Sequence, residues 1–151
     1  MNKIKIISLN ISKKKGIPKT QVNSVILIEN WGIEGDIHSG NWHRQISLLA
    51  IESIDKMRQL GLNVRPGAFA ENITIEGINL LDLKIGDRLI IGNAVLEVTQ
   101  IGKECHSKCA IYYQAGDCVM PREGIFARVI SGGKINVGDE VIVEKLIPID
   151  V

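Results

Sequence analysis

Short runs of β-branched and aliphatic residues, separated by glycine and aspartate, dominate this chain and restrict it to a fold built mainly from strands. Residues 3–9 alternate between polar and apolar side chains, as a half-buried strand does. Similar runs are 22–27, 45–49, 72–75, 88–91, 94–101, 126–130 and 140–145. Many short strands with turn signals between them predict a β-barrel or a sandwich.

The turns between these runs have characteristic residues. Gly92-Asn93 suits a tight hairpin, because both residues tolerate positive φ. The stretches 83–91 and 135–143 are near-copies, each with a Gly-Asp pair followed by an alternating run. We interpret them as a recurrent turn or bulge of a barrel rather than as a true repeat.

One segment has the period of a helix. Apolar residues between Leu49 and Leu60 can share one face, with charged residues on the other, and Gly61 suits a helix end. Shorter helical turns are expected near 66–71 and 105–113. The predicted fold class is therefore mainly β, a β-barrel with a few short helices.

Composition narrows the class of protein. With 151 residues we predict one domain, 1–151, with one buried core. A net charge of +1 and 4% aromatic residues argue against nucleic acid and anionic membrane as partners. No apolar run approaches the length of a spanning helix, and no signal-peptide pattern opens the chain. Three cysteines, an odd number, favour the reducing cytoplasm over a secreted disulfide framework.

Cys105 has the surroundings of a reactive thiol. It follows a predicted strand and has Lys103, His106 and Lys108 close in sequence. Cationic neighbours favour the thiolate, whereas a structural cysteine usually has apolar neighbours. A thiolate attacks carbon or sulfur, or it binds a soft metal.

Two other interpretations of the cysteines remain open. Cys105, Cys109 and Cys118 could ligate zinc, although their spacing differs from the paired arms of structural zinc sites. A fourth ligand would then come from His38, His43 or Asp117. Alternatively, Cys109 and Cys118 are small apolar residues of the core.

Two loops carry further candidates. Gly35 and Gly40 bracket Asp36 and His38, which suits a sharp loop that presents amides and an imidazole to an anion or ligand. The alternative is an ordinary turn in which Asp36 binds its own backbone. Asn72 could donate to and accept from a heterocycle edge, or it could be a plain turn residue.

Five stretches, in this order, resemble the MOSC family, named for the C-terminal domain of molybdenum-cofactor sulfurases. They are Gly35-Asp36-x-His38-x-Gly40 with Arg44-Gln45, Gly67-x-Phe69-x-Glu71-Asn72, Leu83-x-Ile85-Gly86-Asp87, Lys103-Glu104-Cys105, and Gly124-Ile125-Phe126 through Gly138-Asp139. The chain is similar to small stand-alone bacterial members. It departs from many relatives in having Glu104 before the cysteine, where they have Arg or Pro.

The resemblance implies a MOSC-type (pyruvate-kinase-barrel-like) β-barrel that binds molybdenum cofactor, a molybdopterin. It implies that Cys105 binds the metal or carries sulfur toward it. On this basis Asn72 would bind the pterin edge, and His38 would position an oxo ligand or transfer a proton. The expected contacts of the cofactor phosphate are the cations Lys15, Lys19, Arg44 and Lys103.

Several functions are compatible with this resemblance. The first is reduction of N-hydroxylated compounds, with electrons from a separate donor protein. The second is transfer of persulfide sulfur on Cys105, which would require a cysteine desulfurase as donor. The third is non-catalytic carriage of intact cofactor, and a structural zinc module is the fourth.

Overall fold

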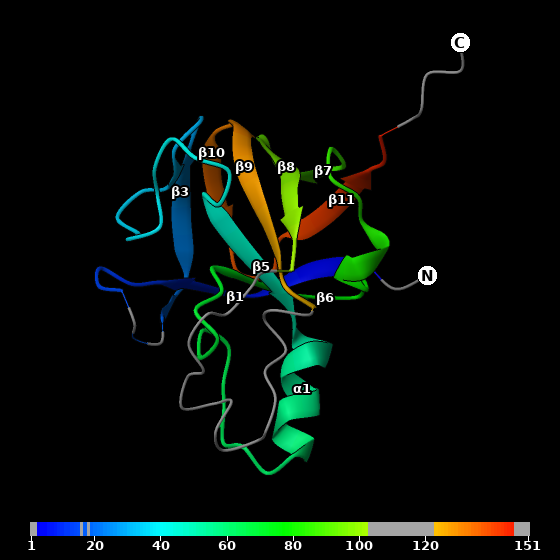
Figure 1. The fold of residues 1–151 in the computed structure, drawn as a ribbon. Coiled ribbons are helices and arrows are strands. Elements are labelled where there is room, and N and C mark those ends of the chain that lie inside the picture. Colours follow the sequence, from blue (N-terminus) through cyan, green and yellow to red (C-terminus); the bar gives the residue numbers. More distant parts are fainter. Residues whose placement is uncertain (1–2, 16, 18, 103–122, 147–151) are drawn as a thin grey trace.

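The computed structural model describes residues 3–15, 17, 19–102 and 123–146 (Figure 1). The predictions made for Lys103, Cys105, Cys109 and Cys118, and for a helical turn at 105–113, lie outside these residues. The described elements are β1 (Ile4–Ile11), β2 (Thr20–Val22), β3 (Ser24–Ile28), β4 (Gly32–Ile33), β5 (Ile46–Ala50), α1 (Ile51–Gln59), β6 (Ile73–Glu76), the 3-10 helix η1 (Leu80–Asp82), β7 (Arg88–Ile91), β8 (Ala94–Ile101), β9 (Ile125–Ser131), β10 (Gly133–Asn136) and β11 (Glu140–Glu144).

The main sheet closes into a barrel. Its strands run in the order β11-β7-β8-β9-β5-β6-β1-β2, and β11 also pairs with β1. Seven strands therefore form the closed ring, while β2 extends from β1 outside it. The β5–β6 pair is parallel and is connected through α1, whereas the other described pairs are antiparallel. This is the mainly β barrel that the sequence predicts.

The alternation seen in the sequence fills the barrel. In β8 the side chains of Ala94, Leu96 and Val98 are buried and face inward with those of neighbouring strands, while Val95 and Glu97 are only partly buried. The principal apolar cluster joins side chains from most strands of both sheets. Burial of this continuous apolar surface is the main force that stabilises the barrel.

The predicted Gly-Asp turns are present before β7 and β11. Gly86 and Gly138 have φ values of +99° and +92°, which favour glycine. The following aspartates, Asp87 and Asp139, each accept a 2.8 Å hydrogen bond from the backbone N–H three residues earlier. The two stretches are thus the same turn used twice, as predicted.

Two predicted elements differ from the structure. The single strand expected at 22–27 is divided at Asn23, because β2 pairs with β1 while β3 joins a separate sheet of order β10-β3-β4. The helical turn expected at 66–71 is a pair of hydrogen-bonded turns. Gly67 and Ala70 have φ values of +95° and +64°, and this left-handed backbone cannot continue a helix.

The predicted helix is confirmed as α1, which lies beyond one end of the barrel (Figure 1). Gly61, just after its C-cap, has a φ of +95° and ends the helix as expected. Ile54 and Met57 of α1 pack with Leu49, Phe69 and Phe126 in a second apolar cluster. Among the described residues, no helix is long and apolar enough to cross a membrane.

Candidate functional site

A cavity of about 500 Å³ opens beside the second apolar cluster. Segments that are distant in sequence meet around it: the β1–β2 connection, the long connection from β4 to β5, the turn before β6, and the start of β9. Its lining residues are Lys15, Ile37, His38, Ser39, Gly40, Asn41, Trp42, Arg44, Ser47, Phe69, Ala70 and Phe126. The cavity therefore combines cationic side chains, an imidazole and aromatic faces.

Arg44 is held in a defined orientation at this cavity. Its guanidinium carbon lies 5.1 Å from the centroid of the Phe126 ring, a cation–π distance. Its Nε donates a 3.0 Å hydrogen bond to Gln100 Oε1. One edge of the guanidinium is thus anchored on the protein, and its planar fork is suited to an anionic oxygen pair. Lys15, an exposed residue of the β1–β2 connection, adds a second cation.

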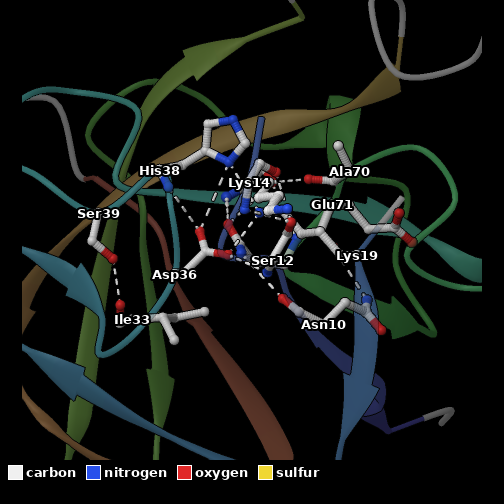
Figure 2. Close-up of polar contacts among 12 residues, drawn as sticks. Asn10, Ser12, Lys14, Lys19, Ile33, Asp36, His38, Ser39, Ala70 and Glu71 are labelled. Carbon is white, nitrogen blue, oxygen red and sulfur yellow. Dashed lines mark hydrogen bonds and ion pairs between the residues drawn. The ribbon is translucent and has the colours of Figure 1, made fainter. Parts of the chain in front are cut away.

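The turn after β4 presents His38 to the cavity. Asp36 Oδ2 accepts a 3.1 Å hydrogen bond from the His38 backbone N–H, two residues along the chain. This is the ordinary turn, with Asp36 bound to its own backbone, that the sequence offered as the alternative to a ligand-binding loop. The Ser39 hydroxyl donates to the Ile33 carbonyl, and Trp42 Nε1 donates to the His38 carbonyl at 2.8 Å. These bonds fix the loop, as Figure 2 shows for Asp36, His38 and Ser39.

Beneath this loop lies a fully buried ion pair. Lys19 Nζ is 2.7 Å from Asp36 Oδ1, and neither side chain has any exposed surface, at 0% each. Burial alone would raise the pKa of Asp36, but hydrogen bonds from Lys19 and from the Ser12 amide hold that pKa below its usual value. Burial lowers the pKa of Lys19, while its hydrogen bond and charge interaction with Asp36 oppose that effect. A buried pair of this kind must stay intact, because either charge alone would be costly to bury.

The same ammonium also touches the imidazole. Lys19 Nζ lies 2.9 Å from His38 Nδ1, and the His38 side chain is 36% exposed. The second carboxylate oxygen of Asp36 lies 3.8 Å from that nitrogen. Lys19 therefore connects the buried carboxylate to a side chain that lines the cavity (Figure 2).

Asn72 lies inside the barrel wall behind the cavity. Its side-chain oxygen accepts hydrogen bonds from the Ser47 amide at 3.0 Å and the Ser47 hydroxyl at 3.2 Å. Its side-chain nitrogen donates to the Asn10 carbonyl at 3.2 Å. Asn72 is 0% exposed, so in this structure it ties strands together, and its bonds to Ser47 connect it to a residue that lines the cavity.

Glu71, next to Asn72, is buried with one oxygen lacking a partner. Its Oε2 accepts from the Gly67 amide at 3.0 Å and from the Thr74 hydroxyl at 2.8 Å. Its Oε1 has no hydrogen-bond partner in the part of the chain that is described. Burial raises the pKa of Glu71, and the Gly67 and Thr74 donors only partly offset that effect.

The structure brings Lys15, His38 and Arg44 to one cavity. It places Lys19 and Asn72 below the surface, Lys19 in its ion pair with Asp36 and Asn72 in hydrogen bonds to Ser47 and Asn10. Lys103 and Cys105 lie outside the described residues. Within those residues, no group of three or more His, Cys, Asp or Glu is placed to hold a metal ion.

Sequence reasoning missed the aromatic and small residues of the cavity wall, which are Trp42, Ser47, Phe69 and Phe126. It also missed the pairing of Lys19 with Asp36, since the two residues belong to different loops. One signal was available: the strand-like run at 3–9 contains Ser8 and continues into Asn10, and both are buried polar residues. A polar side chain facing a barrel interior usually marks a hydrogen-bond network.

A family model of the MOSC domain matches residues 34–142, which include the loop of His38 and the strands around the cavity. The chain belongs to the MOSC domain family. This family is associated with molybdenum cofactor. No curated protein matches the chain significantly.

Crystal structures of other proteins have the same fold. The YUAD protein from Bacillus subtilis is similar with a TM-score of 0.81 and 22% identity, over 96% of this chain and 97% of that one. YiiM from Geobacillus stearothermophilus gives a TM-score of 0.69 and 23% identity, over 94% of this chain and 75% of that one. YiiM from Escherichia coli gives a TM-score of 0.70 and 20% identity, over 97% of this chain and 72% of that one. At these identities the comparison establishes the barrel fold and not a shared reaction.

Proposed function

We propose that this MOSC protein binds molybdenum cofactor in the cavity between the β1–β2 connection and the loop of His38, with the Cys105 thiolate as a metal ligand. The observation that carries the proposal is the donor set of the cavity. Lys15, Arg44 and His38 converge there on a space bounded by Phe69 and Phe126. An anionic, planar, heterocyclic cofactor needs cations for its phosphate and flat apolar faces for its rings.

Each described residue has a role in this proposal. Arg44, anchored by Gln100 and Phe126, would hold anionic oxygens through its free guanidinium edge. Lys15 would add a mobile countercharge at the mouth. Lys19 and Asn72, first considered as direct contacts, would instead support the site from below, since both are buried. Lys103 remains a further candidate for the phosphate.

The reaction we propose is reduction of N-hydroxylated compounds. Two electrons from a separate donor protein and two protons convert the N–OH group to N–H and release water. When bound, the cofactor would supply the redox-active metal for this chemistry. His38 would hold or deliver a proton at the oxygen that leaves.

A test of the cofactor site uses protein made in a cofactor-producing host. Molybdenum content is measured for the wild type, Cys105→Ala, Cys109→Ala and Cys118→Ala. We expect near-stoichiometric molybdenum in the wild type and in the last two variants, with loss in Cys105→Ala, because a thiolate ligand cannot be replaced by a methyl group. Normal molybdenum in Cys105→Ala would overturn the ligand assignment.

The same samples separate the other functions. Wild-type protein without molybdenum but with one extra sulfur on Cys105 would favour a persulfide carrier. Bound cofactor without turnover of N-hydroxylated compounds would favour a cofactor carrier. Zinc in the wild type but not in Cys105→Ala would favour a structural metal site.

The role of His38 is tested separately from binding. In His38→Ala we expect reduction to fall by about 100-fold or more, the usual contribution of a positioned acid or base, with sulfur loading of Cys105 largely intact. His43→Ala is the matched control, since His43 hydrogen-bonds Gln100 and is not among the cavity-lining residues. Equal loss of reduction and sulfur loading in His38→Ala would contradict a proton-transfer role.

A further inference from the structure

The buried ammonium of Lys19 is in contact with the imidazole of His38. A lysine usually extends its charged end into water, but the Lys19 side chain is 0% exposed. Its Nζ lies 2.7 Å from Asp36 Oδ1 and 2.9 Å from His38 Nδ1. Lys19 stands just before β2, whereas Asp36 and His38 stand in the turn after β4. The fold therefore brings a charged donor from one loop to the ring of another.

The available hydrogens decide which ring nitrogen carries the proton. A charged lysine has three donors and no acceptor. The 2.7 Å contact with the Asp36 carboxylate keeps Lys19 in this charged form. The 2.9 Å contact with the ring is then an N–H of Lys19 donating to Nδ1. Nδ1 must present its lone pair, and the proton of the neutral ring lies on Nε2.

Asp36 does not compete for a proton on this nitrogen. The distance from Asp36 Oδ2 to His38 Nδ1 is 3.8 Å, beyond hydrogen-bonding range. Oδ2 instead accepts from the His38 backbone N–H at 3.1 Å, and Oδ1 accepts from the Ser12 amide at 3.0 Å and from Lys19. This differs from sites in which a carboxylate accepts the Nδ1 proton directly and leaves Nε2 as the base.

We propose that Lys19 is a positioning residue that holds His38 as a neutral imidazole with its proton on Nε2. Figure 2 shows Nδ1 directed toward the Lys19–Asp36 pair and the other ring nitrogen on the far side of the ring. In this tautomer Nε2 is a hydrogen-bond donor and not an acceptor, so any group that binds His38 there must present an acceptor, such as an oxo or phosphate-type oxygen. Its use in catalysis depends on the proposed function, but the tautomer itself does not.

His43 provides an internal control within the same chain. Its Nε2 lies 2.9 Å from Gln100 Oε1, which also accepts from Arg44 Nε at 3.0 Å. Gln100 is oriented because its side-chain N–H donates to the Gly102 carbonyl at 2.7 Å. His43 should thus also carry its proton on Nε2, but for a reason independent of Lys19.

The test is long-range ¹H–¹⁵N correlation NMR of the cofactor-free protein near neutral pH. The chain has three histidines, so signals are assigned by their loss in His38→Gln and His43→Gln. In the wild type we expect an unprotonated Nδ1 in His38. In Lys19→Met, Asp36 loses its counter-ion and faces Nδ1, so the ratio of protonated to unprotonated Nδ1 should rise at least about tenfold, with His43 unchanged. Gln100→Leu should do the reverse, changing His43 and sparing His38.

A protonated Nδ1 in wild-type His38 would overturn the proposal. The wild-type spectrum therefore tests the proposal by itself if Lys19→Met does not fold. An unchanged His38 ring in a folded Lys19→Met protein would also overturn it. Since the experiment needs no cofactor, its outcome is distinct from the molybdenum measurement that tests the proposed function.

Discussion

Asp36 and Asp87 are two buried aspartates that each follow a left-handed glycine and lie beside a lysine. Asp87 accepts hydrogen bonds of 2.8 Å from both the Leu146 and Lys84 amides. Its lysine, Lys145, is 54% exposed and 3.4 Å away, whereas the lysine of Asp36 is 0% exposed at 2.7 Å. Asp36 likewise accepts two amide hydrogen bonds, from Ser12 and His38. The two aspartates therefore differ in the lysine, which at Asp36 is buried and also touches His38.

The comparison shows that one local pattern, a Gly-Asp turn, occurs both in the framework of the barrel and beside the cavity. Where the lysine beside the carboxylate is exposed, as at Asp87, we expect the turn to hold the barrel together without that lysine. Where the lysine is buried, as at Asp36, the same kind of turn connects the interior to the cavity. The burial of the lysine separates the two cases, and sequence does not report it directly.

The largest expected effect is on the stability of the buried pair. Lys19→Met should lower the free energy of unfolding by about 3–5 kcal/mol, because it leaves the buried charge of Asp36 without its counter-ion. Lys145→Met is the matched control and should cost at most about 1 kcal/mol, since that pair is open to solvent. Urea denaturation measures both, and equal losses would remove the distinction between the two aspartates.

A smaller effect is expected at the structural turn. Asp87→Asn should lower the free energy of unfolding by about 1.5–3 kcal/mol, because charge-assisted bonds to the Leu146 and Lys84 amides are weakened. The molybdenum content of the folded variant should match the wild type.

Asp36→Asn should lower molybdenum content, because His38 loses its support through Lys19. Loss of cofactor in Asp87→Asn alone would reverse the assignment of the two turns.

The smallest expected effect is on acid stability. Hydrogen-bond donors hold the folded pKa of both Asp36 and Asp87 below the usual value. Each therefore contributes stability above the unfolded pKa of about 3.9, and that contribution is lost as pH falls from there through the folded pKa. Asp87→Asn should flatten the acid side of a stability–pH curve measured by urea denaturation. An unchanged acid slope would contradict the depressed pKa of Asp87.

The sequence predicted the barrel better than the site, for physical reasons. The strands 88–91 and 94–101 were predicted with the bounds that β7 and β8 have, because alternation and the Gly92 turn are local signals. The two-residue strand β4 and the strand β10 were missed, since each is too short or too polar to show a period. Pairing with β3 defines both of them.

The site depended on contacts between distant segments. The resemblance to the MOSC family proposed His38, Arg44 and Lys15 as site residues, and the fold gathers these three at one cavity. Nothing in the sequence distinguished Lys15 from Lys19, four residues apart in one connection, yet one is exposed and the other is buried. That difference arises because Lys19 pairs with Asp36, and only the folded chain brings these two together.

The central claim is that the cavity at Arg44 holds the cofactor, and one measurement tests it most directly. Molybdenum per protein is measured for the wild type, Arg44→Met and Arg128→Met made in a cofactor-producing host. Arg128, a residue of β9, is the matched control. Its Nη2 lies 2.7 Å from Glu97 Oε2 on β8, and Arg128 does not line this cavity. We predict near-stoichiometric molybdenum in the wild type and Arg128→Met, and loss of most of the molybdenum in Arg44→Met, because the cation that binds the anionic oxygens is removed. Equal molybdenum in the two arginine variants would contradict the claim.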